Sequence, residues 1–141
     1  MHQVVATTGR YFVGDFIGTF EPGNLVLTGP NLPHNWVSDV KTNKKVTLRN
    51  RGIQFTDEAI RGAMGVLPEL QCLSEMLNKS RNGLLFSNAT SEVVAPKLAE
   101  LMHAHGIRRH ELFIAIVNAL SQDIQMHVPY THLTPPTNKT V

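Results

Sequence analysis

The chain has 141 residues, of which 42% are apolar and 17% charged, and its formal net charge is +2 with neutral histidines. This length suits a single domain with its own core, and so small a net charge gives no support for direct nucleic-acid binding. The sequence shows no signal-peptide pattern, no apolar stretch of membrane-spanning length and a single cysteine, Cys72. We therefore expect a cytoplasmic protein without a membrane association, in which Cys72 is a buried, reduced thiol.

Residues 2–55 are predicted to form β-structure. The segments at 4–5 and 11–13 are rich in β-branched and aromatic side chains. After a polar run that is typical of a loop, Val46–Arg49 has the composition of another strand. The phase of the apolar residues changes at 50–52, which indicates either a β-bulge or two separate strands.

The centre of this half holds two turn signals around one apolar run. Pro22-Gly23 is a tight-turn dipeptide, and the Pro- and Gly-rich segment 29–33 predicts a second rigid corner. Between them, Leu25–Leu27 is too short for a helix and is typical of a buried strand. The chain is expected to continue as a strand from His34, where the alternation of side chains places His34 and Trp36 on the same face.

From residue 57 the periodicity becomes helical. Asp57 is expected to cap a short helix that ends by Gly65, and three longer helices are predicted at about 68–82, 90–105 and 108–125. Pro96 either lies in the first turns of the second of these helices or marks a later start. An apolar stripe runs along the last helix: Phe113, Ile116, Val117, Leu120 and Ile124. The Pro- and Thr-rich residues from His127 onward are expected to form a loose tail. Strands followed by helices predict an α+β fold.

Three runs in the first 36 residues resemble the cupin-type sensor domain of AraC-type transcriptional regulators. They are Gly9-Arg10-Tyr11-Phe12-Val13-Gly14-Asp15, Phe20-Glu21-Pro22-Gly23-Asn24-Leu25-Val26-Leu27 and Gly29-Pro30-Asn31-Leu32-Pro33-His34-Asn35-Trp36. Later pieces fit in the same order, namely Gln54-Phe55, Pro68-Glu69-Leu70 and Arg81-Asn82-Gly83-Leu84-Leu85-Phe86, so that the resemblance covers about residues 4–125.

The resemblance implies a mainly antiparallel jelly-roll (RmlC-like) cupin barrel followed by three α-helices. Residues 1–56 would form the barrel portion, 57–126 the helical dimerisation portion and 127–141 the tail. The barrel would receive a small effector, a sugar or another metabolite, and a separate helix-turn-helix domain would bind DNA. Family members usually have a preceding strand with His and Glu residues. We therefore expect a barrel that is incomplete at its N-terminus and a chain without the DNA-binding domain.

His34 and Trp36 are the first candidates for an effector site in the barrel lumen. An aromatic ring with a few directed polar groups is typical of sugar sites, and the predicted polar complement is Tyr11, Arg10, Asp15 and Gln54. Two alternatives stay open: Trp36 fills the core, and Arg10 and Asp15 serve a surface pair and a turn. A metal would need about three converging ligands. The usual ligand strand is missing and the histidines from residue 103 onward belong to helices or tail, so no metal or other cofactor is expected.

The stripe on the last helix either covers the barrel or contacts a second subunit as a homodimer interface. Our leading hypothesis is an effector-binding and dimerisation domain without catalysis. One alternative is a small metal-dependent cupin enzyme, such as an isomerase or dioxygenase, with His34 as a ligand. Another is a purely structural dimeric fragment whose barrel is filled by side chains.

Overall fold

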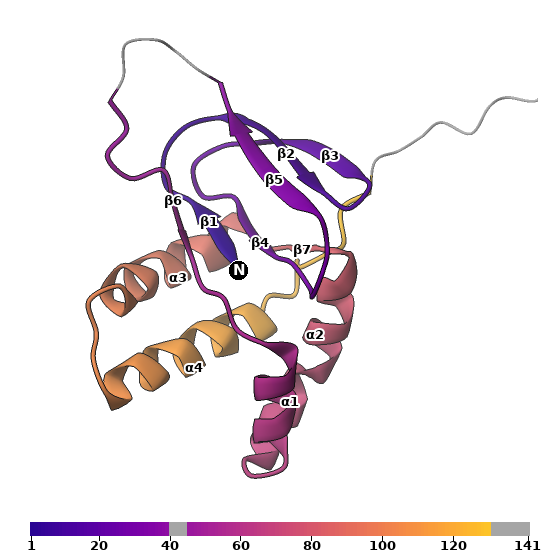
Figure 1. The fold of residues 1–141 in the computed structure, drawn as a ribbon, viewed down its shortest axis with the longest axis vertical. Helices are drawn as coiled ribbons and strands as arrows, with labels where there is room; N and C mark the ends of the chain where they lie inside the picture. Colours follow the sequence, from indigo (N-terminus) through magenta and orange to yellow (C-terminus); the bar gives the residue numbers. More distant parts are fainter. Residues whose placement is uncertain (40–44, 131–141) are drawn as a thin grey trace, which may run out of the picture.

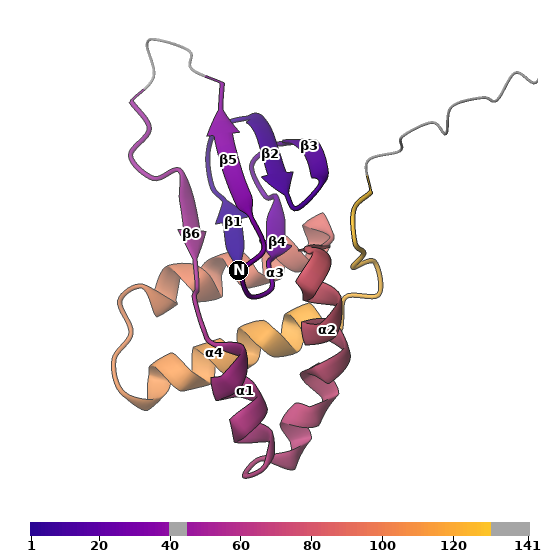
Figure 2. The ribbon, with the colours of Figure 1, turned by 45° about the vertical axis from the view of Figure 1, so that its right-hand side comes forward.

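The computed structural model describes residues 1–39 and 45–130. Two antiparallel sheets pack against each other, and helices cover the outer face of one of them (Figures 1 and 2). The strands are β1 (His2–Val4), β2 (Gly9–Val13), β3 (Phe16–Phe20), β4 (Leu25–Leu27), β5 (His34–Ser38), β6 (Asn50–Gly52) and β7 (Leu84–Leu85). The helices are α1 (Asp57–Met64), α2 (Ser74–Lys79), α3 (Asn88–Leu101) and α4 (Ile107–Ser121), with 3₁₀ segments η1 (Pro68–Leu73) and η2 (Ser80–Asn82). The predicted α+β class is confirmed.

The strands form one sheet in the order β6-β1-β4-β7 and a second in the order β3-β2-β5. All of the strand pairs in the described part of the chain are antiparallel, and none of them joins one sheet to the other. The edge strand β5 of the second sheet and the edge strand β6 of the first are therefore not hydrogen-bonded to each other. The sandwich is open between these two edges.

Strand β4 separates two hydrophobic cores. Its Val26 faces the other sheet, where it joins the inter-sheet core of Val4, Tyr11, Val13, Phe20, Val26 and Trp36. Leu25 and Leu27 face the opposite way and pack among the helices in a larger helical core. All three side chains are buried, which confirms the prediction of a buried strand. A continuous apolar run is what a strand with both faces covered requires.

The hairpin of β2 and β3 contains the strand predicted at residues 11–13, and its side chains alternate between two faces. Tyr11 and Val13 point into the inter-sheet core, whereas Phe12 lies on the outer face. Gly14 and Asp15 form the turn, with Gly14 at a φ of 56°. A left-handed backbone at this position suits glycine, which has no Cβ to clash.

The strand expected at Val46–Arg49 is not present. The backbone forms a strand with β1 only from residue 50, in β6, where Asn50 opposes Val4 and Gly52 opposes His2. Neither a bulge nor a break between two strands occurs at 50–52. The polar segment 50–52 forms the strand, and the β-branched segment 46–49 does not, because strand formation depends more on an available partner edge than on propensity.

Two details of the first helices differ from the prediction. The N-cap of α1 is Thr56 and not Asp57, since the Thr56 hydroxyl accepts a hydrogen bond from the Ala59 amide at 3.1 Å. The single helix predicted at 68–82 is divided into η1, α2 and η2. Cys72 lies in η1 with its side chain exposed, so the expectation of a buried thiol is wrong.

The later helices are closer to expectation. A hydrogen bond from the Thr90 amide to the Ser87 hydroxyl caps α3, which begins at Asn88 and includes Pro96 in its interior. The predicted helix end at residue 105 is four residues too late. Strand β7 lies between α2 and α3, within the portion expected to be helical throughout.

The stripe on α4 is mostly buried inside the molecule. Ile116, Val117 and Leu120 belong to the helical core, and Phe113 packs against it with its ring edge-to-face on Phe55 at 5.4 Å. Ile124 lies beyond the end of α4 and is 97% exposed. The prediction that these residues form a dimer interface is therefore wrong for the buried members, because the chain's own sheet and helices already cover them.

The segment after α4 is attached to the fold where a loose tail was expected. His127 pairs with Leu85 of β7 through two backbone hydrogen bonds, at 2.8 and 3.0 Å. Pro129 is buried. The rest of the predicted tail, residues 131–141, lies outside the described residues.

Candidate functional site

A cleft of about 1370 Å³ opens between the edge strands β5 and β6 and extends down to the start of α1. Its polar lining comes mainly from the N-terminal half of the chain. The residues that matter for the argument are His2, His34, Trp36, Arg49, Asn50 and Gln54. The open side of the sandwich therefore holds a hollow that is larger than the usual small-molecule site of about 300–1,000 Å³.

The end of the cleft at the sheets is built on stacked rings. Trp36 stacks on His2 with centroids 3.9 Å apart, and on Tyr11 at 5.5 Å. His34 meets the same indole edge-to-face at 6.0 Å. Tyr11 and Trp36 are direct partners in the β2–β5 ladder, and His2 comes from the other sheet. The stack therefore links the two sheets.

Trp36 belongs to the core more than to the ligand-facing surface. It is 7% exposed, and its Nε1 donates a hydrogen bond to Asn24 Oδ1 at 3.1 Å. Because His2 and Tyr11 already stack on the indole, little of it is left for a sugar. Of the two alternatives for Trp36, the structure favours core packing.

His2 has an unusual electrostatic environment. Burial, together with the smaller electrostatic effects of the Met1 amino group, Arg49 and His34, lowers the pKa of His2 from 6.5 to about 4. The imidazole is therefore neutral at pH 7. Its Nδ1 is buried and has no hydrogen-bond partner among the described residues, although buried polar atoms are usually paired.

Arg49 connects the two walls of the cleft. One of its guanidinium nitrogens donates to the backbone carbonyl of Trp36 on β5. Its own carbonyl accepts from the amides of Val5 and Ala6, at 2.8 and 3.1 Å, which fixes the backbone just before β6. The side chain is half-buried and lines the cleft. Arg49 thus holds a positive charge beside the ring stack.

Three of the six predicted ligand residues, His34, Trp36 and Gln54, line the cleft. His34 is exposed, and its Nδ1 donates to the carbonyl of Leu32 at 2.6 Å, which leaves Nε2 as an acceptor. Tyr11 lies behind Trp36, in the core.

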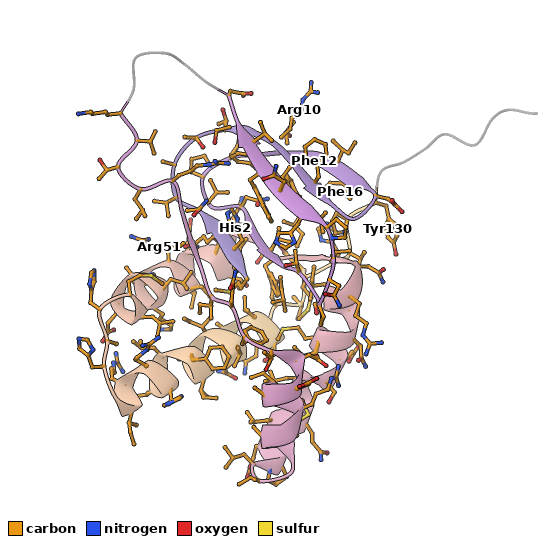
Figure 3. The ribbon with its side chains drawn as sticks, viewed as in Figure 1. His2, Arg10, Phe12, Phe16, Arg51 and Tyr130 are labelled. Atoms are coloured by element: carbon orange, nitrogen blue, oxygen red, sulfur yellow. The ribbon has the colours of Figure 1, made fainter. Side chains whose placement is uncertain are left out.

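Arg10 and Asp15 are not part of the cleft. Arg10 projects from the outer face of the sheet β3-β2-β5, next to Phe12 (Figure 3), because neighbours in a strand point to opposite faces and Tyr11 points inward. Asp15 is exposed in the β2–β3 turn. The alternative in which these two residues serve the surface and a turn is therefore favoured.

The sequence argument missed His2 and Arg49. His2 lies on β1 (Figure 3) and reaches Trp36 because the sheet that contains β1 packs against the sheet that contains β5. No pattern in the local sequence predicts the contact between His2 and Trp36. Arg49 was assigned to the strand expected at Val46–Arg49, and its position in the sequence gives no sign that its side chain reaches β5.

Within residues 1–39 and 45–130, no group of three His, Cys, Asp or Glu side chains is arranged to hold a metal ion. In the same residues, no helix is long and apolar enough to cross a membrane. Comparisons with protein-family models, curated proteins and solved structures each found no match to this chain. The AraC-type resemblance therefore stays a prediction from the motifs.

Proposed function

We propose that the chain is the effector-sensing and dimerisation domain of an AraC-type transcriptional regulator, with a cupin-type jelly-roll sandwich as its sensor. The observation that carries this proposal is the cleft between β5 and β6. Its wall includes His34 and Trp36, which end the run that most resembles that family. The cleft would bind a small metabolite without transforming it. DNA binding would belong to a helix-turn-helix domain outside these 141 residues.

The cleft also has a physical route to the helices. Leu27 of β4 and Leu77 of α2 line it, and both belong to the helical core. A ligand that contacts these side chains favours one packing of the helices over another, and such a difference in affinity between two states is what a sensor needs. Dimerisation through the exposed surface of the helices is part of the proposal, with the buried α4 residues excluded from it.

Thermal unfolding in the presence of metabolites tests the proposal. A panel of sugars and organic acids at millimolar concentration should include compounds that raise the melting temperature, because a ligand that binds only the native state stabilises it. His34→Ala should remove that increase, whereas His110→Ala on the exposed surface of α4 should keep it. If no compound stabilises the wild-type chain, or if both variants respond like the wild type, the cleft is not the effector site.

A further inference from the structure

The cleft has an unbalanced positive charge at its ring-stack end. A guanidinium carries five N–H donors, and the described structure gives Arg49 one acceptor, the carbonyl of Trp36. None of the ion pairs among residues 1–39 and 45–130 includes Arg49. The two segments outside the description contain no Asp or Glu. Arg49 therefore faces the cleft without a carboxylate side chain of its own.

The other titratable groups around the cleft do not balance this charge. His2, His34 and the Met1 amino group lie at the same end as Arg49. His2 is neutral at pH 7 and burial lowers the pKa of the Met1 amino group from 8.0 to about 6, so Arg49 is the main positive charge at this end. The acidic lining residues, Asp57 and Glu58, belong to α1 at the other end, and Asp57 already pairs with Arg61 at 2.8 Å. A negative group is therefore missing at one end only.

We propose that the effector is an organic acid whose carboxylate binds at Arg49 beside the His2–Trp36 stack. This inference rests on the proposed function, because it names the ligand class of the same cleft. Arg49 would donate its remaining N–H groups to the carboxylate oxygens, since charge-assisted pairs with arginine are the strong and directional ones. Ile53 and Phe55, which line the cleft and are half-buried, offer an apolar wall to the hydrocarbon part of the acid.

The same arrangement assigns a role to His2. Its buried Nδ1 has no partner, and a carboxylate next to it would accept a hydrogen bond from a protonated imidazole. The bound anion would counter the positive charge of Arg49 and that of the Met1 amino group, whose pKa burial lowers to about 6 and which becomes charged as the pH falls, while Asp57 and Glu58 remain at the far end. The bound acid would therefore raise the pKa of His2, and binding would take up a proton as the pH falls below 7.

The probes are benzoate and its neutral isostere benzamide, titrated into the full chain at constant ionic strength. Trp36 is the only tryptophan, so its fluorescence reports on the ring stack. Benzoate should change the emission saturably and bind at least about tenfold more tightly than benzamide. Its affinity should be higher at about pH 5.5 than at about pH 7.5, which are one pH unit below and above the usual histidine pKa.

Three variants separate charge from structure. Arg49→Gln should remove the preference for benzoate, Arg49→Lys should keep part of it, and Arg51→Gln should behave like the wild type. Arg51 makes the matched control because it is a cation two residues away that lines a different hollow, with Gln3 and Glu92. Circular dichroism shows whether Arg49→Gln is folded; if it is not, the wild-type preference and Arg49→Lys decide the question.

Each outcome has a distinct meaning. Equal responses to benzoate and benzamide, or a benzoate preference that survives in folded Arg49→Gln, overturn the organic-acid inference. A saturable response to a neutral sugar with none to benzoate also overturns it, but leaves the proposed sensor function in place. Failure of every compound in the stabilisation panel, benzoate included, contradicts both.

Discussion

Leu120→Ala tests whether the apolar stripe of α4 belongs to the molecule's own core. Leu120 is 1% exposed and lies in the helical core. The substitution deletes Cγ and both Cδ atoms, which at about 0.8 kcal/mol per buried carbon is about 2.4 kcal/mol of lost transfer free energy. The cavity left behind adds to this loss, so we expect a total decrease in the free energy of unfolding of about 3–4 kcal/mol.

The assay is equilibrium urea unfolding followed by circular dichroism. For a domain with an m-value of about 2 kcal/mol per molar urea, the midpoint should fall by roughly 1.5–2 M. Ile114→Ala is the matched control, because Ile114 lies on the same helix but is 44% exposed. That substitution should change stability by no more than about 0.5 kcal/mol.

A core residue and an interface residue also differ in their dependence on protein concentration. The destabilisation by Leu120→Ala should be the same at two protein concentrations that differ by about twentyfold. If the residue stabilised a dimer, the destabilisation would depend on concentration. An unchanged urea midpoint together with loss of a dimer in analytical ultracentrifugation would refute the reasoning. Leu120 would then be covered by a second subunit and not by its own fold.

Three further predictions concern individual groups. His2→Phe should flatten the pH dependence of stability between pH 6.5 and about 4, because the lowered pKa of His2 makes the wild type lose stability as the pH falls through that window; an unchanged pH profile would show that His2 titrates normally. Burial opposes ionisation of Asp123, but backbone hydrogen bonds hold its pKa below the usual value. Asp123→Asn should therefore cost about 2 kcal/mol near neutral pH, and the cost should shrink as acid protonates the wild-type carboxylate; a pH-independent cost would contradict this assignment. Gly83→Ala should destabilise the fold, because Gly83 has a φ of 79° and a Cβ there would overlap Val13, whereas Gly62→Ala in α1 should stabilise it by about 0.5–1 kcal/mol. Thermal melts of the two glycine variants that moved in the same direction would refute this contrast.

The sequence predicted best where a regular period coincides with burial on a defined face. Leu25–Leu27 is buried on both sides, and α4 buries its stripe. In each case the pattern reflects contacts that the local element itself determines. The error about α4 concerned only what covers the stripe, which depends on distant elements.

The failures share the opposite cause. The strand β6 consists of Asn50, Arg51 and Gly52, and it forms because β1 offers a free edge more than 45 residues away in the chain, as the pairing of Gly52 with His2 shows. Residues about 50 positions apart do not fall within one local stretch of sequence, so a local pattern cannot predict their pairing. His2 was missed as a site residue for the same reason.

Alternation could have corrected one site prediction in advance. Tyr11 and Arg10 are adjacent in a strand, so they cannot both face the interior. Because the aromatic and β-branched members of β2 are the odd-numbered ones, Arg10 had to lie outside. The identification of His34 and Trp36 as neighbours on one face of β5 did not need tertiary information, and their ring contact agrees with it.

The burial of β4 on both faces has a consequence for how the molecule loses its structure. Neither core can open without exposing one face of this strand, since Val26 belongs to one core and Leu25 and Leu27 to the other. The sheets and the helices are therefore expected to melt together in one cooperative transition. The amide hydrogens of β4 should then exchange with solvent only through global unfolding, so this short strand should be among the slowest-exchanging segments of the domain.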